Sequence, residues 1–324
     1  MRRRDLILLL GGATATWQFM PIAQAREPSR ISILHAGFPN RTPIHLLFKA
    51  LLALGYEHGR TATIDLYGGE GDSARLATLA GQLKAQQPDV VIAITSPAAL
   101  ALKKAGVTTP VVFAFISDPV GLGIVESLAR PGANFTGVTY SDAVLGGKRL
   151  EYLIEALPGR KRVAVLWNRS FPEHRLIFES IARSASTQKI DIISRELRGP
   201  DDLAPAFQDA AHAGAECAIF LADNTAFGRR KEIAGLALAN HLPSIHSFAT
   251  EAEDGALMSF GPDMGENYRR VAALADRILK GAKPSNLPVE EPTKFTLAIN
   301  LKTAAAFGIK LPESLLLQAD QVIQ

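Results

Sequence analysis

Two short apolar segments, Val90–Ile94 and Val111–Ile116, constrain the fold of this chain more than any other feature of its sequence. Both are rich in Val, Ile and Phe, and neither alternates with polar residues. Strands of this composition are typically buried on both faces, as in a parallel sheet covered by helices. The intervening Pro97–Lys104 is expected to be a helix, because its first turn tolerates proline and Thr95 or Ser96 can cap it.

The alternation of strands and helices occurs twice along the chain. The first series runs from Ile31 to the region of Gly137–Asp142, and the second restarts at Ala143 and ends near Phe260. Strands that alternate with helices indicate βαβ units and parallel sheets, so two such series predict two similar lobes. The expected fold class is therefore α/β, with two doubly wound parallel-sheet lobes joined by a hinge.

The remaining residues, 264–324, are too few for a third core. They are expected to return to the first lobe, so that lobe 1 consists of 26–138 plus 264–324 and lobe 2 of 139–263. The chain would then cross between the lobes a second time near Ser259–Asp263. Within lobe 1, one more helix is expected at Gly121–Leu128.

Residues 1–25 have the features of an export signal. Arg2–Arg4 form a positive segment, Leu6–Leu10 begin an apolar one, and Ala23-Gln24-Ala25 fits a small-x-small cleavage site. The apolar part is shorter than the roughly 20 residues that span a bilayer, so the mature protein is expected to be periplasmic. Arg3-Arg4-Asp5 also resembles a twin-arginine signal, which leaves two export routes open.

The net charge gives no support for nucleic-acid binding. The whole chain carries +3, but three arginines and Asp5 of the signal contribute +2, so about +1 remains for the mature part. No run of Lys and Arg alternates with aromatic residues, as a surface that follows a phosphate backbone would require. The lone Cys217 lies in an apolar run and is expected to be a small buried hydrophobe.

Motifs of several enzyme classes are absent from the sequence. It has no G-x-S-x-G nucleophile elbow and no G-x-x-x-x-G-K-[ST] phosphate loop. Gly121-Leu122-Gly123 begins like a dinucleotide fingerprint, but Glu126 stands where the third glycine belongs. The histidines lack metal-ligand spacing, His35 is interpreted as structural, and the carboxylates around Glu251 as a solvated turn. No enzyme activity, metal or other cofactor is therefore expected.

Small polar turns at strand ends are the best candidates for a site. Ligands of open α/β sheets bind outside the carboxyl ends of the strands, so two facing lobes would place these turns around a cleft. The helix that follows Thr95-Ser96 offers the N–H groups of Ala98 and Ala99 to a ligand carboxylate. Asp118 or Asp223 would suit a ligand ammonium, with helix capping as the alternative role. The candidate ligand-binding residues are Gly37, Phe38, Thr95, Ser96, Ser117, Asp118, Asn168, Asp223, Asn224 and Phe248.

Aromatic side chains near these turns would supply the apolar walls of the cleft. Core packing is the alternative role for each of them. They are Phe38, Tyr140, Trp167, Phe248 and Phe260.

Several blocks spread over nearly the whole chain share one resemblance. They are Arg2–Ile7, Leu10–Gly12, Ser117–Val120, Leu128–Val138, Met258–Pro262, Pro292–Phe295 and Ile299–Ala304. Together they resemble the ABC-transporter substrate-binding proteins of the tryptophan/tyrosine-binding type. The resemblance implies a type I periplasmic binding fold, in which two lobes are joined by three crossing strands and close on a ligand like a hinged clamp.

The resemblance also implies a function, that of the extracytoplasmic solute-binding component of an ABC importer. The expected partners are a small molecule, such as an aromatic or other amino acid, and an ABC permease of the inner membrane, with the protein itself a monomer. Asp223-Asn224-Thr225 resembles the turn that helps to hold the amino acid in family members. Asn168-Arg169-Ser170 is shorter and more basic than the Asn-rich loop of those members, so an anionic ligand near Arg169 stays open.

Two other functions fit the same sequence. One is a ligand-sensing protein for a membrane receptor, which would use the same clamp, and the other is an exported α/β enzyme. In a clamp of either kind, hinge rotation is expected at Gly137, Thr139 and Ser259–Gly261.

Overall fold

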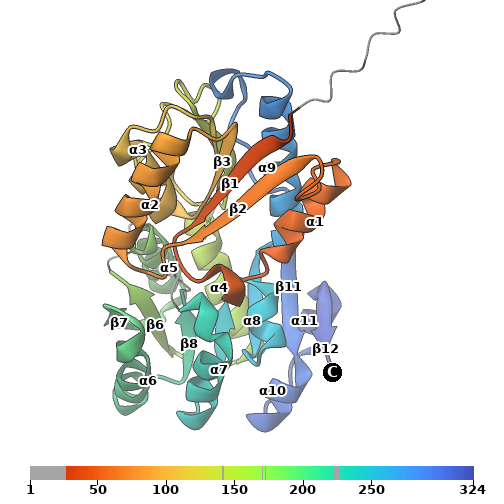
Figure 1. Ribbon diagram of the computed structural model, residues 1–324. Helices are drawn as coiled ribbons and strands as arrows, with labels where there is room; N and C mark the ends of the chain where they lie inside the picture. The colour runs from red at the N-terminus through yellow and green to blue at the C-terminus, as the bar shows by residue number, and fades with distance from the viewer. Residues whose placement is uncertain (1–26, 141, 170, 172, 222, 224–225) are drawn as a thin grey trace, which may run out of the picture.

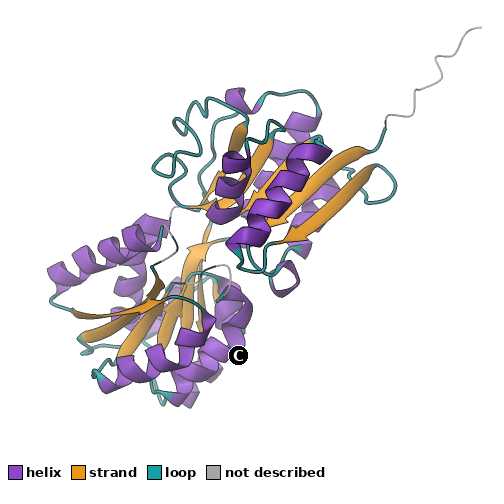
Figure 2. Ribbon diagram, turned by 60° about the vertical axis from the view of Figure 1, so that its left-hand side comes forward, coloured by secondary structure: helices purple, strands orange, loops and turns teal. Residues whose placement is uncertain are grey.

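The chain forms two α/β units, each built on its own sheet (Figures 1 and 2). The computed structural model describes residues 27–140, 142–169, 171, 173–221, 223 and 226–324. Within these residues, one sheet has five strands and the other has seven. This architecture agrees with the predicted fold class of two α/β lobes.

The first sheet is parallel throughout. Its strands lie in the order β2 (Ala62–Gly68), β1 (Ser29–His35), β3 (Val90–Ile94), β4 (Val111–Ile116) and β5 (Phe135–Thr139). Every residue of β3 and β4 is buried, so both faces of the sheet have to be covered by helices.

Two pairs of helices cover the two faces of this sheet. In β3, the side chains of Val90, Ile92 and Ile94 pack toward one face and those of Val91 and Ala93 toward the other. Figure 1 shows the pairs on opposite sides of the strands. The first pair is α1 (His45–Ala53) with α9 (Met264–Leu279), and the second is α2 (Ser73–Gln86) with α3 (Ser96–Ala105).

The second sheet is parallel except at one pair of strands. Its order is β12 (Gln321–Ile323), β11 (Phe295–Asn300), β10 (Met258–Pro262), β9 (Ser244–His246), β8 (Cys217–Phe220), β6 (Arg162–Asn168) and β7 (Asp191–Leu197). Only β10 and β11 are antiparallel. One core contains residues of α4 (Asp142–Ala156), α5 (His174–Gln188), α10 (Leu301–Ala306) and α11 (Glu313–Gln318). The other contains residues of α6 (Leu203–His212) and α7 (Arg230–Ala239), and the short α8 (Ala249–Glu253) lies beside β10 and β11.

The C-terminal residues do not all return to the first lobe, as was expected for 264–324. Helix α9 packs on the first sheet, but β11 and β12 belong to the second sheet. The physical reason is the pairing of β11 with β10, which places Leu297 and Ile299 in the second core. The prediction is therefore wrong for residues 295–324, which complete the second unit.

Three segments of the described chain connect the two units. They lead from β5 to α4, from β10 to α9, and from the 3-10 turn Pro284–Asn286 to β11. The Thr139 N–H donates to the Glu290 carbonyl at 2.8 Å, and the Asp263 N–H donates to the Lys294 carbonyl at 3.0 Å. Neighbouring segments are thus hydrogen-bonded to each other where they pass between the sheets.

The helix expected at Gly121–Leu128 does not form. The Gly121 N–H donates to Asp118 Oδ1 at 2.7 Å, and the Ile124 N–H donates to the Pro119 carbonyl at 2.8 Å. Gly123 has a φ of +64°, which lies outside the right-handed helical region. The segment is a series of turns, and one carboxylate oxygen of Asp118 is engaged within it.

Candidate ligand-binding site

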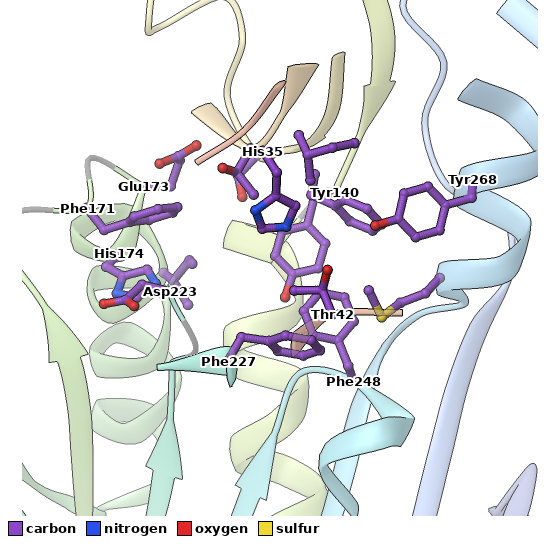
Figure 3. A pocket seen from close by; sticks show the side chains of 16 residues that line it. His35, Thr42, Tyr140, Phe171, Glu173, His174, Asp223, Phe227, Phe248 and Tyr268 are labelled. Atoms are coloured by element: carbon purple, nitrogen blue, oxygen red, sulfur yellow. The ribbon is translucent and has the colours of Figure 1, made fainter. Parts of the chain in front are cut away.

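A pocket lies between the two units, where parallel strands of both sheets end (Figure 3). Its cavity volume, the space open to the centres of water molecules, is about 60 Å³, and it is partly open to solvent. Both units contribute to it, so a molecule bound there would be enclosed when one unit closes on the other. The lining residues are His35, Thr42, Ile94, Thr95, Phe115, Ser117 and Tyr140, then Phe171, Glu173, His174, Ile177, Asp223, Phe227 and Phe248, and finally Met264 and Tyr268 of α9.

Aromatic rings form much of the apolar wall. Tyr140 stacks on Phe248 with ring centroids 5.2 Å apart, and Phe115 meets Tyr268 edge to face at 5.1 Å. Phe227 meets Phe248 edge to face at 5.3 Å. These rings come from both units and from α9, so the apolar wall spans the interface between them.

An irregularity of β4 directs the ring of Phe115 into the pocket. The register of β4 against β5 shifts between Ala114 and Ile116, and Phe115 has a φ of +58°, which is strained for a bulky residue. Regular alternation would place Phe115 on the same face as Phe113, in the core under α2 and α3. A bulge re-aims the side chain, and Phe115 packs instead in the cluster on the other face.

His35 is a buried residue of the pocket, with its ring held by the backbone. Its Nδ1 accepts a hydrogen bond from the Gly37 N–H at 2.9 Å, so the proton of the neutral ring lies on Nε2. Burial lowers the pKa of His35 to about 4. Near pH 7 the ring is therefore an uncharged group that donates from Nε2.

His35 makes the stability of the protein depend on pH. Because its pKa is about 6.5 in the unfolded chain and about 4 in the folded one, the unfolded state binds more protons between these values. Stability is then lost as the pH falls from 6.5 to 4, by roughly 3 kcal/mol in total. Urea unfolding at pH 7, 5.5 and 4.5 should show this loss, and the variant His35→Asn, whose Oδ1 can replace Nδ1 as acceptor, should show a smaller one. Equal losses in both proteins would contradict the assignment.

Asp223 is a carboxylate of the pocket that the second unit holds in position. The side-chain amide of Asn168 donates to Asp223 Oδ2 at 2.5 Å, and the Ala226 N–H donates to Oδ1 at 2.8 Å. The Asn168 N–H in turn donates to His174 Nδ1 at 3.0 Å. Asp223 is 7% exposed. These donors hold the carboxylate of Asp223 at the pocket wall.

Ser96 and Glu173 connect the two units directly. Ser96, the first residue of α3, donates from Oγ to Glu173 Oε2 at 2.9 Å, and both residues are almost fully buried. Glu173 immediately precedes α5 in the second unit. Its carboxylate therefore lies at the N-terminus of a helix of the first unit, where the partial positive charge of the helix stabilises an anion.

A second connection lies at the rim of the pocket. Arg230 donates from Nη1 to the Arg41 carbonyl at 3.0 Å, and its Nε pairs with Asp254 at 2.9 Å. The guanidinium also lies 4.4 Å from the ring centroid of Phe227, which lines the pocket. Two contacts between protein groups thus hold the units together on either side of the pocket.

The structure brings four of the ten candidate residues to the pocket wall and places two directly behind it. Those on the wall are Thr95, Ser117, Asp223 and Phe248. Ser96 and Asn168 lie behind it, through their hydrogen bonds to Glu173 and Asp223. Asn224 lies outside the described residues.

The other three candidates do not line the pocket. The Gly37 N–H donates a hydrogen bond to His35 Nδ1. The guanidinium of Arg41 lies over the ring of Phe38, 4.7 Å from the ring centroid. Asp118 faces a neighbouring depression, because it is engaged by the turn at Gly121. The expectation that Gly37, Phe38 and Asp118 line the pocket is therefore wrong.

Two of the aromatic residues that were expected to line the cleft pack in the core instead. Trp167 stacks on Phe178 at 5.1 Å, and Phe260 packs edge to face on Tyr152 at 5.0 Å. Arg169 does not line the pocket either and pairs with Glu196 at 3.1 Å, which removes the reason for an anionic ligand there.

Several pocket residues were missed in the sequence. Phe171 and Glu173 follow the end of β6, so the rule that ligands bind at strand ends applies to them as it does to Asn168. Tyr268 lies in α9, far along the chain, and no local pattern marks it. His35 stands at the end of β1, where a lone histidine carries no signal that separates a binding role from a structural one.

The described residues contain no cluster of His, Cys, Asp and Glu that could hold a metal ion. Cys217 is buried, and burial raises the pKa of its thiol to about 12, so it is inert at neutral pH. Among the described helices, none has the length and apolar character needed to cross a membrane.

Known proteins resemble this chain over most of its length. The sequence model of the family described as ABC transporter substrate binding protein matches residues 44–323. A protein named tyrosine-binding protein, from Clostridioides difficile (strain R20291), is 25% identical over 263 residues, which are 81% of this chain and 75% of that protein.

Solved structures agree with the sequence comparisons. A conserved domain protein from Vibrio cholerae O1 biovar El Tor superposes with a TM-score of 0.85 at 27% identity, over 91% of this chain and 100% of its own. The ABC domain from Streptococcus pneumonia in complex with L-Trp superposes with a TM-score of 0.84 at 26% identity, with the same coverage. Two mainly parallel sheets with a pocket between them, and a family match over nearly the whole chain, lead to one conclusion: the chain belongs to the ABC transporter substrate-binding protein family.

Proposed function

We propose that this chain is the extracytoplasmic solute-binding component of an ABC importer, and that it closes on a small molecule between its two units. The observation that carries the proposal is the pocket itself, which is lined by side chains of both units and combines aromatic rings with a buried carboxylate. A relative named for tyrosine and a similar structure with bound L-Trp support a ligand with an aromatic body and an amino group, amino acids included. The rings would contact the body, and Asp223 would pair with the amino group.

The ligand would act by favouring the closed arrangement. It can shift the equilibrium only as far as its affinity for the closed state exceeds its affinity for the open one. The contacts of Ser96 with Glu173 and of Arg230 with Arg41 add to the stability of the closed state without the ligand taking part. Rotation would take place in the connecting segments, near Gly137, Thr139 and Ser259–Gly261.

Export and delivery complete the proposal. Residues 1–25 would direct the protein to the periplasm by the general secretory or the twin-arginine route. A monomer with bound ligand would then dock on a permease of the inner membrane. A receptor in place of the permease is the alternative, and it would be favoured if the loaded protein bound a sensor domain and its deletion left uptake unchanged.

A thermal-shift screen of the purified protein tests the binding function. The library should contain aromatic and other amino acids, aromatic amines, dicarboxylates and nucleobases. A ligand at about 100 times its Kd adds roughly 2.7 kcal/mol to the stability of the folded protein, which raises the melting temperature by several degrees. If no compound of these classes shifts it, a pocket for small molecules of this kind is excluded. An absorbance spectrum of the same sample tests the enzyme alternative, because a bound cofactor would absorb.

A further inference from the structure

The charged groups of the pocket have one sign. Two carboxylates, Glu173 and Asp223, line it, and no Lys or Arg is among its described lining residues. Arg169, two residues before Phe171, pairs with Glu196, and Arg230, which lies over the ring of Phe227, pairs with Asp254. His35 is neutral near pH 7, since burial holds its pKa at about 4. A ligand anion would therefore find no cationic side chain on the pocket wall.

The helix N-terminus that would suit a ligand carboxylate already holds one from the protein. Ser96 begins α3, and its Oγ donates to Glu173 Oε2 at 2.9 Å, with both groups buried. A second carboxylate brought to this position would face Glu173, which is only 2% exposed. Like charges at such short range strongly oppose each other, so one of them would have to take up a proton or move away.

The remaining surface suits a cation with an aromatic body. In Figure 3, Glu173 and Asp223 lie at one side of the pocket, and Tyr140, Phe248 and Tyr268 lie toward the other. An ammonium group at the acidic side would pair with Asp223. An aromatic body would fill the space between the rings.

We infer that the pocket is specific for aromatic amines that lack a carboxylate, because Glu173 occupies the place of the ligand carboxylate at the N-terminus of α3. The inference rests on the proposed binding function and narrows its ligand class from amino acids to arylalkylamines. Glu173 is then a specificity-determining residue, and Asp223 is the residue that binds the amino group.

Calorimetric titrations with matched pairs of probes test this inference. Tryptamine is compared with L-tryptophan, and tyramine with L-tyrosine, because each pair differs only in the carboxylate. We expect each amine to bind the purified protein at least about tenfold more tightly than its amino acid, which corresponds to 1.4 kcal/mol. If an amino acid binds as tightly as its amine, the inference is overturned while the proposed function stands. If none of the four binds, the proposed ligand class and the inference fall together.

Substitution of Glu173 tests the cause of the preference. Glu173→Ala vacates the N-terminus of α3, so the ratio of amine affinity to amino-acid affinity should fall by about tenfold or more. Glu173→Gln, which keeps the shape and removes the charge, should lower the ratio in the same direction and covers the case that the alanine variant does not fold. Glu179→Gln is the matched control, because Glu179 lies on α5, which Glu173 precedes, pairs with Arg175 and does not line the pocket. An unchanged ratio in a folded Glu173 variant would overturn the assignment.

Discussion

Replacing Asp223 by alanine is expected to weaken the binding of tryptamine, or of any amino acid that the pocket accepts, by about 30-fold or more. The loss of one partner from a buried, hydrogen-bonded charge pair costs roughly 2–5 kcal/mol, and 1.4 kcal/mol is a factor of ten in Kd. Asn168 and Ala226 hold the carboxylate of Asp223 in place. The free-energy cost of ordering the Asp223 carboxylate when the ligand binds would therefore be small. Calorimetric titration at constant salt measures the effect.

Asp118 offers a matched control for this substitution. Both aspartates follow a strand, and both accept a hydrogen bond from a backbone N–H three residues on, Gly121 in one case and Ala226 in the other. Only Asp223 lines the pocket, so Asp118→Ala should leave the affinity unchanged. Asp223→Asn keeps an acceptor for Ala226 and removes the charge. Wild-type affinity in that variant would show that the amino group binds elsewhere.

Strands that are buried on both faces are the elements that the sequence predicts best. Val90–Ile94 and Val111–Ile116 have in the structure the bounds expected from their apolar runs. The reason is physical, since an apolar run flanked by turn-forming residues leaves little choice of where the strand begins and ends. The local sequence pattern does not specify which strand pairs with which in the sheet. The antiparallel pairing of β11 with β10, and hence the place of residues 295–324, depends on contacts between distant segments.

The candidate site shows the same division between local and distant information. The rule for strand ends located Thr95, Ser117 and Asp223 at the pocket, because it depends only on where parallel strands end. It could not locate Tyr268, whose helix packs on the sheet from a remote part of the chain. Nor could it show that Glu173 reaches across to Ser96, since that contact exists only when the two units are together.

Glu251 illustrates how a cluster of charges can mislead. The sequence pattern suggested a solvated turn, but Glu251 is only 1% exposed. Its Oε2 accepts from the N–H groups of Ser247 and Phe248 at 3.1 and 2.9 Å, and its Oε1 lies 3.1 Å from His246 Nδ1. The side chain turns inward to satisfy the free N–H groups at the start of α8, and in doing so it fixes the backbone of Phe248 at the pocket.

The second large effect is expected from Gly261→Ala, which should destabilise the folded protein by about 3 kcal/mol. Gly261 lies in β10, beside the connection to α9, and pairs with Thr296 of β11. A Cβ atom at this position would overlap the Ser247 carbonyl oxygen and come within 3.4 Å of the Arg149 guanidinium. Because the first of these is a backbone atom, the strand itself would have to move. Urea unfolding monitored by circular dichroism measures the loss.

Gly235→Ala gives the opposite expectation in the same unit. Gly235 lies within α7, and a Cβ there would meet no atom within 4 Å. Alanine is a better helix former than glycine, so this variant should gain roughly 0.5–1 kcal/mol. Two chemically identical changes would then shift the stability in opposite directions, because Gly235 lies in a helix with free space around its Cα and Gly261 lies in a strand against a backbone carbonyl. If Gly261→Ala were as stable as the wild type, the close approach of Ser247 to β10 would be wrong.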